Sequence, residues 1–149
     1  MNPKKKPQSV KNGVFRIVAS NKAHYEQLLD KTAELACISL ILEDVSLFNT
    51  SELTAADFSD ANLAVIFGCI GNLLKDGITD ITQQQILDEV HSLNLSSIET
   101  SDVADLLIKM KAMDVVVTNF HTYTKRVKKS AYLIRLSDNA TNLTNSPRS

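Results

Sequence analysis

The chain has 149 residues, of which 44% are hydrophobic, and a formal net charge of −1, which fits one packed domain. No apolar run approaches the roughly 20 residues of a membrane-spanning helix, and no apolar stretch follows the lysine-rich start as in a secretory signal, so we expect a cytoplasmic protein without membrane contact. The charge is uneven: residues 1–18 hold five bases and no acid, residues 19–114 hold sixteen acids and five bases, and residues 115–149 hold six bases and one acid.

The chain begins with a basic segment, residues 1–20, that is expected to be a flexible arm. A helical globular body is predicted for residues 21–114. Its first helix is long, because Ser20 or Asn21 can cap it and apolar residues recur at helical spacing up to Glu43. The C-terminal part of this helix is apolar on most sides, which predicts that it is buried.

The middle of the body contains a capping signal and the most apolar helix of the chain. Thr54 and Asp57 have the spacing of a capping box, after which Phe58 is expected to point into the core. The helix over residues 61–75 is apolar nearly all round, which predicts that it is the central helix. Gly77 is expected to end it.

Four small side chains inside the predicted helices are expected to face neighbouring elements. Gly68 and Gly71 each cost roughly 1 kcal/mol relative to alanine in a helix, so their expected use is close approach of a second helix. Cys37 and Cys69 lie in apolar helical stretches of a chain without an export signal. We therefore expect reduced core thiols and no disulfide.

Three more helices complete the pattern, over residues 82–93, from residue 100 or 101 to 113, and over residues 116–139. The last two are predicted to form a hairpin whose long second helix occupies residues 115–140, followed by a linker-like tail, residues 141–149. Its outer apolar stripe has no evident partner in a small domain, which is typical of contact with another chain. The expected residues of a dimer or higher oligomer interface are Met110, Met113, Tyr132, Leu133 and Leu136. The alternative is that this stripe folds back on the first helix of a monomer.

The two basic ends are candidates for weak or indirect contact with DNA, since a polyanion would be repelled by the acidic middle. The alternative is a solvated arm and a solvated helix face. The candidate residues are Lys4, Lys5, Lys6, Lys125, Arg126, Lys128 and Lys129.

No catalytic, cofactor or metal motif stands out. The phosphate-binding pattern Gly-x-x-x-x-Gly-Lys-Ser/Thr is absent, and the three histidines and two cysteines are too scattered for a zinc site. Adjacent carboxylates such as Asp88 and Glu89 point in different directions on a helix. We therefore expect no cofactor, no metal and no enzymatic activity of this chain.

Several spacings match a known pattern. The apolar run over residues 34–42 precedes a Leu-x-x-x-Asp-Phe element at residues 53–58. Ile66 and Phe67 follow that Phe by eight and nine residues, and Gly77 comes ten residues later. Near the end, the matching positions are Tyr123, Val127, Ala131 and Leu136. Over residues 34–143 the chain resembles the N-terminal domain of the DnaB-type replicative DNA helicases, in a divergent version that we expect to be encoded by a phage or plasmid.

The resemblance implies an all-α fold, with a helical globular part of about five to six helices followed by a C-terminal helical hairpin. In that family the domain is not the motor. Its hairpins dimerise, and six domains form a collar, a trimer of dimers, that docks primase and contacts the helicase loader in the primosome. The resemblance thus implies a collar or scaffold domain that acts in DNA replication, with an ATPase in a second domain of the parent helicase.

Two alternatives stay open. One is a stand-alone phage protein of the same fold that binds or inhibits a host helicase, which the length of the natural reading frame would distinguish. The other is a DNA-binding accessory protein that uses its basic ends, which salt-dependent DNA binding would reveal.

Overall fold

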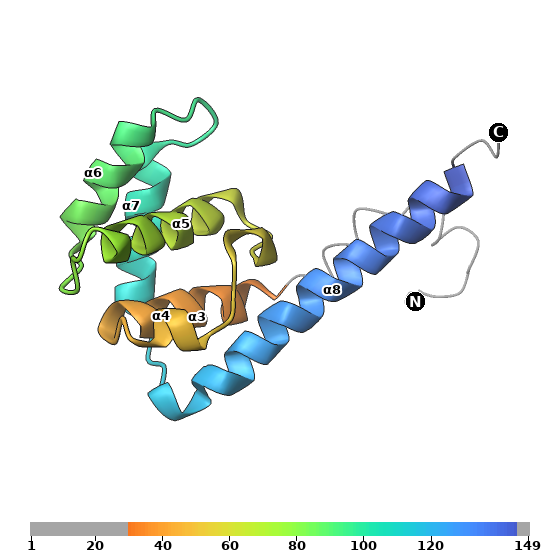
Figure 1. The fold of residues 1–149 in the computed structure, drawn as a ribbon, viewed down its shortest axis with the longest axis horizontal. Coiled ribbons are helices and arrows are strands. Elements are labelled where there is room, and N and C mark those ends of the chain that lie inside the picture. Colours follow the sequence, from red (N-terminus) through yellow and green to blue (C-terminus); the bar gives the residue numbers. More distant parts are fainter. Residues whose placement is uncertain (1–29, 146–149) are drawn as a thin grey trace, which may run out of the picture.

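The computed structural model describes residues 30–145 and consists, in that range, of helices joined by turns (Figure 1). The absence of strands there confirms the predicted all-α class. Two 3₁₀ turns, η2 (Ala55–Asp57) and η3 (Val117–Asn119), connect the longer elements. The α-helices are α3 (Lys31–Glu43), α4 (Leu47–Thr50), α5 (Ala61–Lys75), α6 (Gln83–Leu93), α7 (Thr100–Lys111) and α8 (Phe120–Asn145).

The first described helix, α3, starts later than the sequence predicts. Asp30 is its N-cap: its backbone is non-helical, and its carboxylate accepts a hydrogen bond from the N–H of Ala33 at 3.2 Å. The prediction of one unbroken helix through Asp30 is therefore wrong. The expected caps Ser20 and Asn21, like the basic arm with Lys4, Lys5 and Lys6, lie outside the described residues.

Helix α3 is the most enclosed element of the body. Every residue from 33 to 41 is buried, because α8 covers one side of α3 while α4, α5 and α7 contact the rest (Figure 1). The sequence predicts α5 as the central helix, but α3 is the more enclosed of the two. One side of α5 enters the core, whereas Ala64 and Val65 on its other side are only half-buried.

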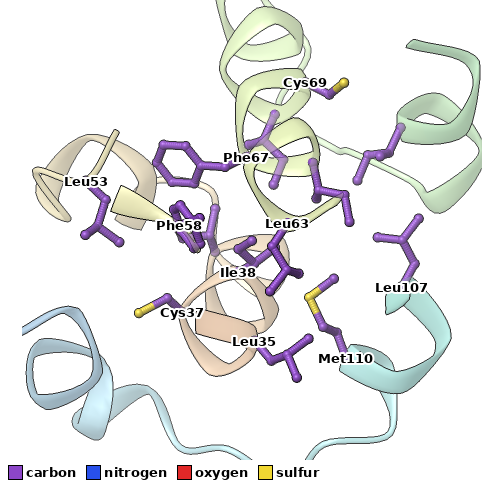
Figure 2. Packing of buried hydrophobic residues seen from close by; sticks show 14 of the residues in the cluster. Leu35, Cys37, Ile38, Leu53, Phe58, Leu63, Phe67, Cys69, Leu107 and Met110 are labelled. Carbon is purple, nitrogen blue, oxygen red and sulfur yellow. The ribbon is translucent and has the colours of Figure 1, made fainter. Parts of the chain in front are cut away.

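Helix α5 otherwise has the predicted bounds and packs through its aromatic residue. The Asp60 side chain caps it, and Gly77, with a φ of 85°, follows its end. The Phe67 ring lies 4.7 Å from that of Phe48 and 4.9 Å from that of Phe58, measured between centroids. Figure 2 shows Phe58 and Phe67 inside the cluster of buried residues, which confirms the expected position of Phe58.

The small residues of α3 and α5 have different surroundings. A Cβ on Gly71 would lie 2.9 Å from Cζ of Phe48, so α4 does approach α5 closely there, whereas Gly68 has no atom within 4 Å of such a Cβ. The prediction of a close approach is thus right for Gly71 and wrong for Gly68. Cys37 and Cys69 are buried and unpaired, as expected, and burial raises their thiol pKa values to about 12 and about 11.

Helices α6 and α7 follow the sequence pattern closely. Thr82 caps α6 and forms the reciprocal capping box with Gln85. The N-cap of α7 is Glu99, one residue before Thr100 and two before Ser101, the two caps that the sequence suggests. Both helices present their apolar sides to the core beside α5.

The predicted hairpin of the last two helices does not form. Helix α7 packs on α3, α5 and α6, and after the turn α8 runs away from it along α3 (Figure 1). The apolar sides of the two helices therefore meet the body and do not meet each other. Helix α8 also continues to Asn145, into the segment 141–149 that the sequence predicts as linker-like.

Candidate interaction surface

Helix α8 has two parts with different surroundings. Its near half, residues 120–131, lies against the body, and its side chains Phe120, Val127 and Ala131 are at most 8% exposed. Tyr123 is half-buried beside the same cluster. This half packs on α3, the first helix that the structure describes.

A bidentate ion pair fixes the near half to the start of α3. The Arg126 guanidinium donates from Nε to Oδ2 and from Nη2 to Oδ1 of Asp30, each at 2.8 Å. The hydrogen bond from Arg126 holds the pKa of Asp30 below its usual value, and the same bond raises the pKa of Arg126. The guanidinium also lies 5.4 Å from the ring centroid of Tyr123. Arg126 thus ties α8 to the cap of α3.

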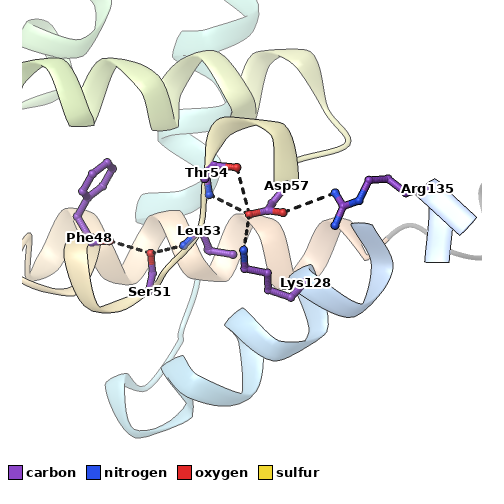
Figure 3. A network of polar contacts seen from close by, with 7 residues as sticks. All are labelled: Phe48, Ser51, Leu53, Thr54, Asp57, Lys128 and Arg135. Carbon is purple, nitrogen blue, oxygen red and sulfur yellow. Dashed lines mark hydrogen bonds and ion pairs between the residues drawn. The ribbon is translucent and has the colours of Figure 1, made fainter. Parts of the chain in front are cut away.

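A second polar contact joins α8 to η2 (Figure 3). The Asp57 carboxylate, on a residue that is 6% exposed, accepts from Nζ of Lys128 at 3.0 Å and from the N–H of Thr54 at 2.9 Å. Arg135 lies at 4.0 Å from the other oxygen of Asp57. The Thr54–Asp57 capping box is therefore confirmed. Its carboxylate also binds Lys128 and so connects η2 to α8.

The expected nucleic-acid contacts on α8 do not form one free basic face. Arg126 and Lys128 are directed to the carboxylates of Asp30 and Asp57. Lys125 and Lys129 are exposed. A phosphate backbone would therefore have to compete with protein carboxylates for two of these four cations.

The far half of α8, from residue 132 onward, carries apolar side chains that the body does not cover. Figure 1 shows this part of the helix projecting from the body. Tyr132 is 56% exposed and Leu136 is 46% exposed, while Leu133 and Ile134 are half-buried. Tyr132, Leu133 and Leu136 form the outer stripe of α8, the name used for them below. Ile134 lies on the other side of the helix, where it lines a hollow described below.

The two methionines of the predicted interface lie elsewhere. Met110 is 1% exposed and points into the core (Figure 2), so its assignment to an oligomer interface is wrong. The reason is that α7 turns this side toward α3, where Ser39 Oγ donates to the Met110 carbonyl oxygen at 3.0 Å. Met113 is half-buried and packs against the same core. The candidate surface is therefore confined to the outer stripe of α8.

Sequence reasoning missed a buried acidic residue close to α8. Glu34 is 1% exposed, and its Oε2 accepts from the N–H and the hydroxyl of Ser59 at 3.1 and 2.7 Å. The available signal was a carboxylate in an apolar helical run, between Ala33 and Leu35. It lies next to Asp57, in a hollow described below.

A concavity of about 770 Å³ lies between α3, α6 and α7. Apolar side chains such as Leu42, Ile81 and Leu107 line it, with Glu43 and Lys111 also contributing. Within residues 30–145 no three His, Cys, Asp or Glu side chains are grouped so that they could hold a metal ion. None of the helices in that range combines the length and the apolar character needed to cross a membrane.

Neither protein-family models nor curated proteins nor solved structures match the chain. A proposal of function therefore depends on the geometry of α8 and on the resemblance in the sequence pattern.

Proposed function

We propose that this chain is a collar or scaffold domain of a replicative DNA helicase and that it self-associates through the outer stripe of α8. The observation that carries the proposal is the uncovered apolar surface on a projecting helix, with Tyr132 and Leu136 about half exposed. Such a surface on a soluble domain is typical of a site where another chain binds. Burial of a leucine contributes roughly 1.5–3 kcal/mol, so a few such side chains on each partner support an association.

The near half of α8 makes the proposed surface a rigid one. Because Val127 is fully buried and Arg126 and Lys128 are paired with body carboxylates, the helix leaves the body in a defined direction. Two far halves packed antiparallel would place their bodies at opposite ends of a dimer. In the helicase family that the sequence resembles, dimers combine into a collar that docks primase or a loader, and we propose the same class of partner here.

The proposal treats the domain as a scaffold without ATPase activity, because the chain has no Gly-Lys-Ser/Thr loop to hold phosphates. The purified chain is expected not to hydrolyse ATP, with or without DNA. DNA-stimulated hydrolysis above that of a mock preparation would contradict this. A Walker A motif downstream in the natural reading frame would identify a parent helicase, whereas its absence would favour the stand-alone protein that binds a host helicase.

The test of self-association is a double substitution on the outer stripe, Leu133→Glu with Leu136→Glu. Sedimentation is expected to show the wild-type chain as a dimer or higher oligomer and the variant as a monomer, with helical circular dichroism unchanged. Lys125→Glu with Lys129→Glu is the matched control, because it also makes the helix more acidic but leaves the stripe intact. It is expected to remain associated.

Two outcomes would contradict this proposal. One is a wild-type chain that sediments as a monomer at high micromolar concentration. The other is loss of helical circular dichroism in the Leu133 and Leu136 variant, which would mean that the stripe belongs to the core.

A further inference from the structure

A small hollow lies between η2 and the middle of α8, on the side where Asp57 and Arg135 face each other in Figure 3. It has a volume of about 270 Å³. Its lining combines carboxylates with apolar side chains and includes Glu34, Asp57, Phe58, Ser59, Ile134 and Arg135. Since Glu34 is 1% exposed, it forms part of the floor of the hollow.

One oxygen on this floor has no hydrogen-bond partner. Oε2 of Glu34 accepts both bonds from Ser59, but Oε1 is buried and accepts none. Within residues 30–145, no nitrogen of Lys, Arg or His lies within 4.0 Å of the Glu34 carboxylate. A buried carboxylate with an empty oxygen and no counter-charge is unfavourable unless a donor reaches it.

The neighbouring carboxylate, that of Asp57, does have hydrogen-bond donors. Asp57 already receives Lys128 at 3.0 Å and the N–H of Thr54 at 2.9 Å. Arg135 is 57% exposed and 4.0 Å from Asp57, so it lies at the mouth of the hollow without filling it. The carboxylate oxygen of the hollow that lacks a donor is therefore Oε1 of Glu34.

We propose that this hollow binds the guanidinium group of an arginine side chain presented by a partner protein. A guanidinium is planar, weakly hydrated and carries five N–H donors, so it can donate to Oε1 of Glu34 while its faces lie against apolar walls. Phe58, Ala131 and Ile134 provide such walls. A lysine ammonium is more strongly hydrated and gains less from them. This site is independent of the outer stripe of α8 and of the proposed self-association.

The test is an NMR titration of the full chain with Nα-acetyl-arginine amide. Saturable shifts are expected at the backbone amides of Ser59 and Ala131, which border the hollow. The citrulline analogue, which has nearly the same shape but no charge, is the matched control and is expected to cause no saturable shift. The lysine analogue is expected to bind more weakly than the arginine compound.

Two variants distinguish a binding site from a structural detail. Glu34→Gln keeps an oxygen to accept from Ser59 and removes the charge, so affinity for the arginine probe is expected to fall at least tenfold while thermal unfolding stays the same or rises. Arg135→Ala removes a competing cation from an exposed position and is expected to strengthen binding severalfold.

The proposal is overturned if citrulline or lysine binds as well as arginine, if the shifts map elsewhere, or if the Glu34→Gln affinity is unchanged. Should Glu34→Gln fail to fold, Arg135→Ala decides, because unchanged or weaker binding by that variant would also overturn the proposal.

Discussion

The two halves of α8 show how apolar side chains of one helix can have two roles. Val127 in the near half is 0% exposed, and Leu136, on the same helix, is 46% exposed. Both side chains are aliphatic, but the nine residues between them correspond to about 180° of rotation around the helix, so Val127 faces α3 and the body while Leu136 faces away. A periodic stripe therefore identifies an apolar face, and the neighbouring element determines whether that face becomes core or remains available to a second chain.

The largest effect on stability is expected when the same charge is placed in each half of α8. Val127→Asp buries a carboxylate among apolar neighbours and is expected to lower the free energy of unfolding by roughly 3 kcal/mol or more. Leu136→Asp is expected to change it by less than about 0.5 kcal/mol at concentrations where the chain is monomeric. Urea denaturation of both variants measures the difference. Equal losses would mean that the far half is also part of the core.

Helix α5 offers a smaller version of the contrast between covered and open positions. Gly68→Ala meets no neighbour and is expected to raise the free energy of unfolding by up to about 1 kcal/mol, through helix propensity. Gly71→Ala must displace the Phe48 ring, which is stacked on Phe67. Because overpacking costs roughly 1–3 kcal/mol, the Gly71→Ala variant is expected to be less stable than the Gly68→Ala variant by at least about 1 kcal/mol. Thermal unfolding of the two variants measures this difference. A Gly71→Ala variant more stable than Gly68→Ala would contradict the close contact between α4 and α5.

The smallest expected effect concerns the ion pair that fixes the near half. Arg126→Ala is expected to cost about 0.5–1 kcal/mol at neutral pH, because both side chains are partly exposed and solvent screens the pair. Lys125→Ala, at an exposed position of the same helix, is the control and is expected to cost less.

The pH dependence of this ion pair has a defined sign. The pKa of Asp30 lies below its usual value of 3.8 in the folded chain, so the unfolded chain binds more protons there. The contribution is present above about pH 4 and is lost as pH falls through the folded pKa. Unfolding free energies of wild type and Arg126→Ala should therefore converge below pH 4, and a gap that widens there would contradict the pair.

Local signals were sufficient for much of the fold. The bounds of α5, the Thr54–Asp57 capping box and the cap of α6 at Thr82 follow from side chains within a few residues of one another. Such interactions are encoded by spacing alone, which is why the all-α class and most helix bounds could be predicted.

Long-range contacts were the part that could not be predicted. The apolar side of α8 was assigned to α7, its neighbour in sequence, but α3 covers it. The same error placed Met110 on a surface, although it is 1% exposed. The assignment of Tyr132, Leu133 and Leu136 to an oligomer interface stays a prediction. Glu34 was missed because the spacing of residues along a helix does not tell which distant residue will face its carboxylate.

The contact between Asp30 and Arg126 spans 96 positions of the chain. Closing a flexible loop of that length costs about 4 kcal/mol of chain entropy, so the contact is expected to form late in folding. At the usual rate of translation, roughly 5–20 s separate the synthesis of the two residues. During that time the side of α3 that α8 will cover is exposed on the nascent chain. A chaperone that binds the nascent chain is thus expected to bind this apolar side of α3.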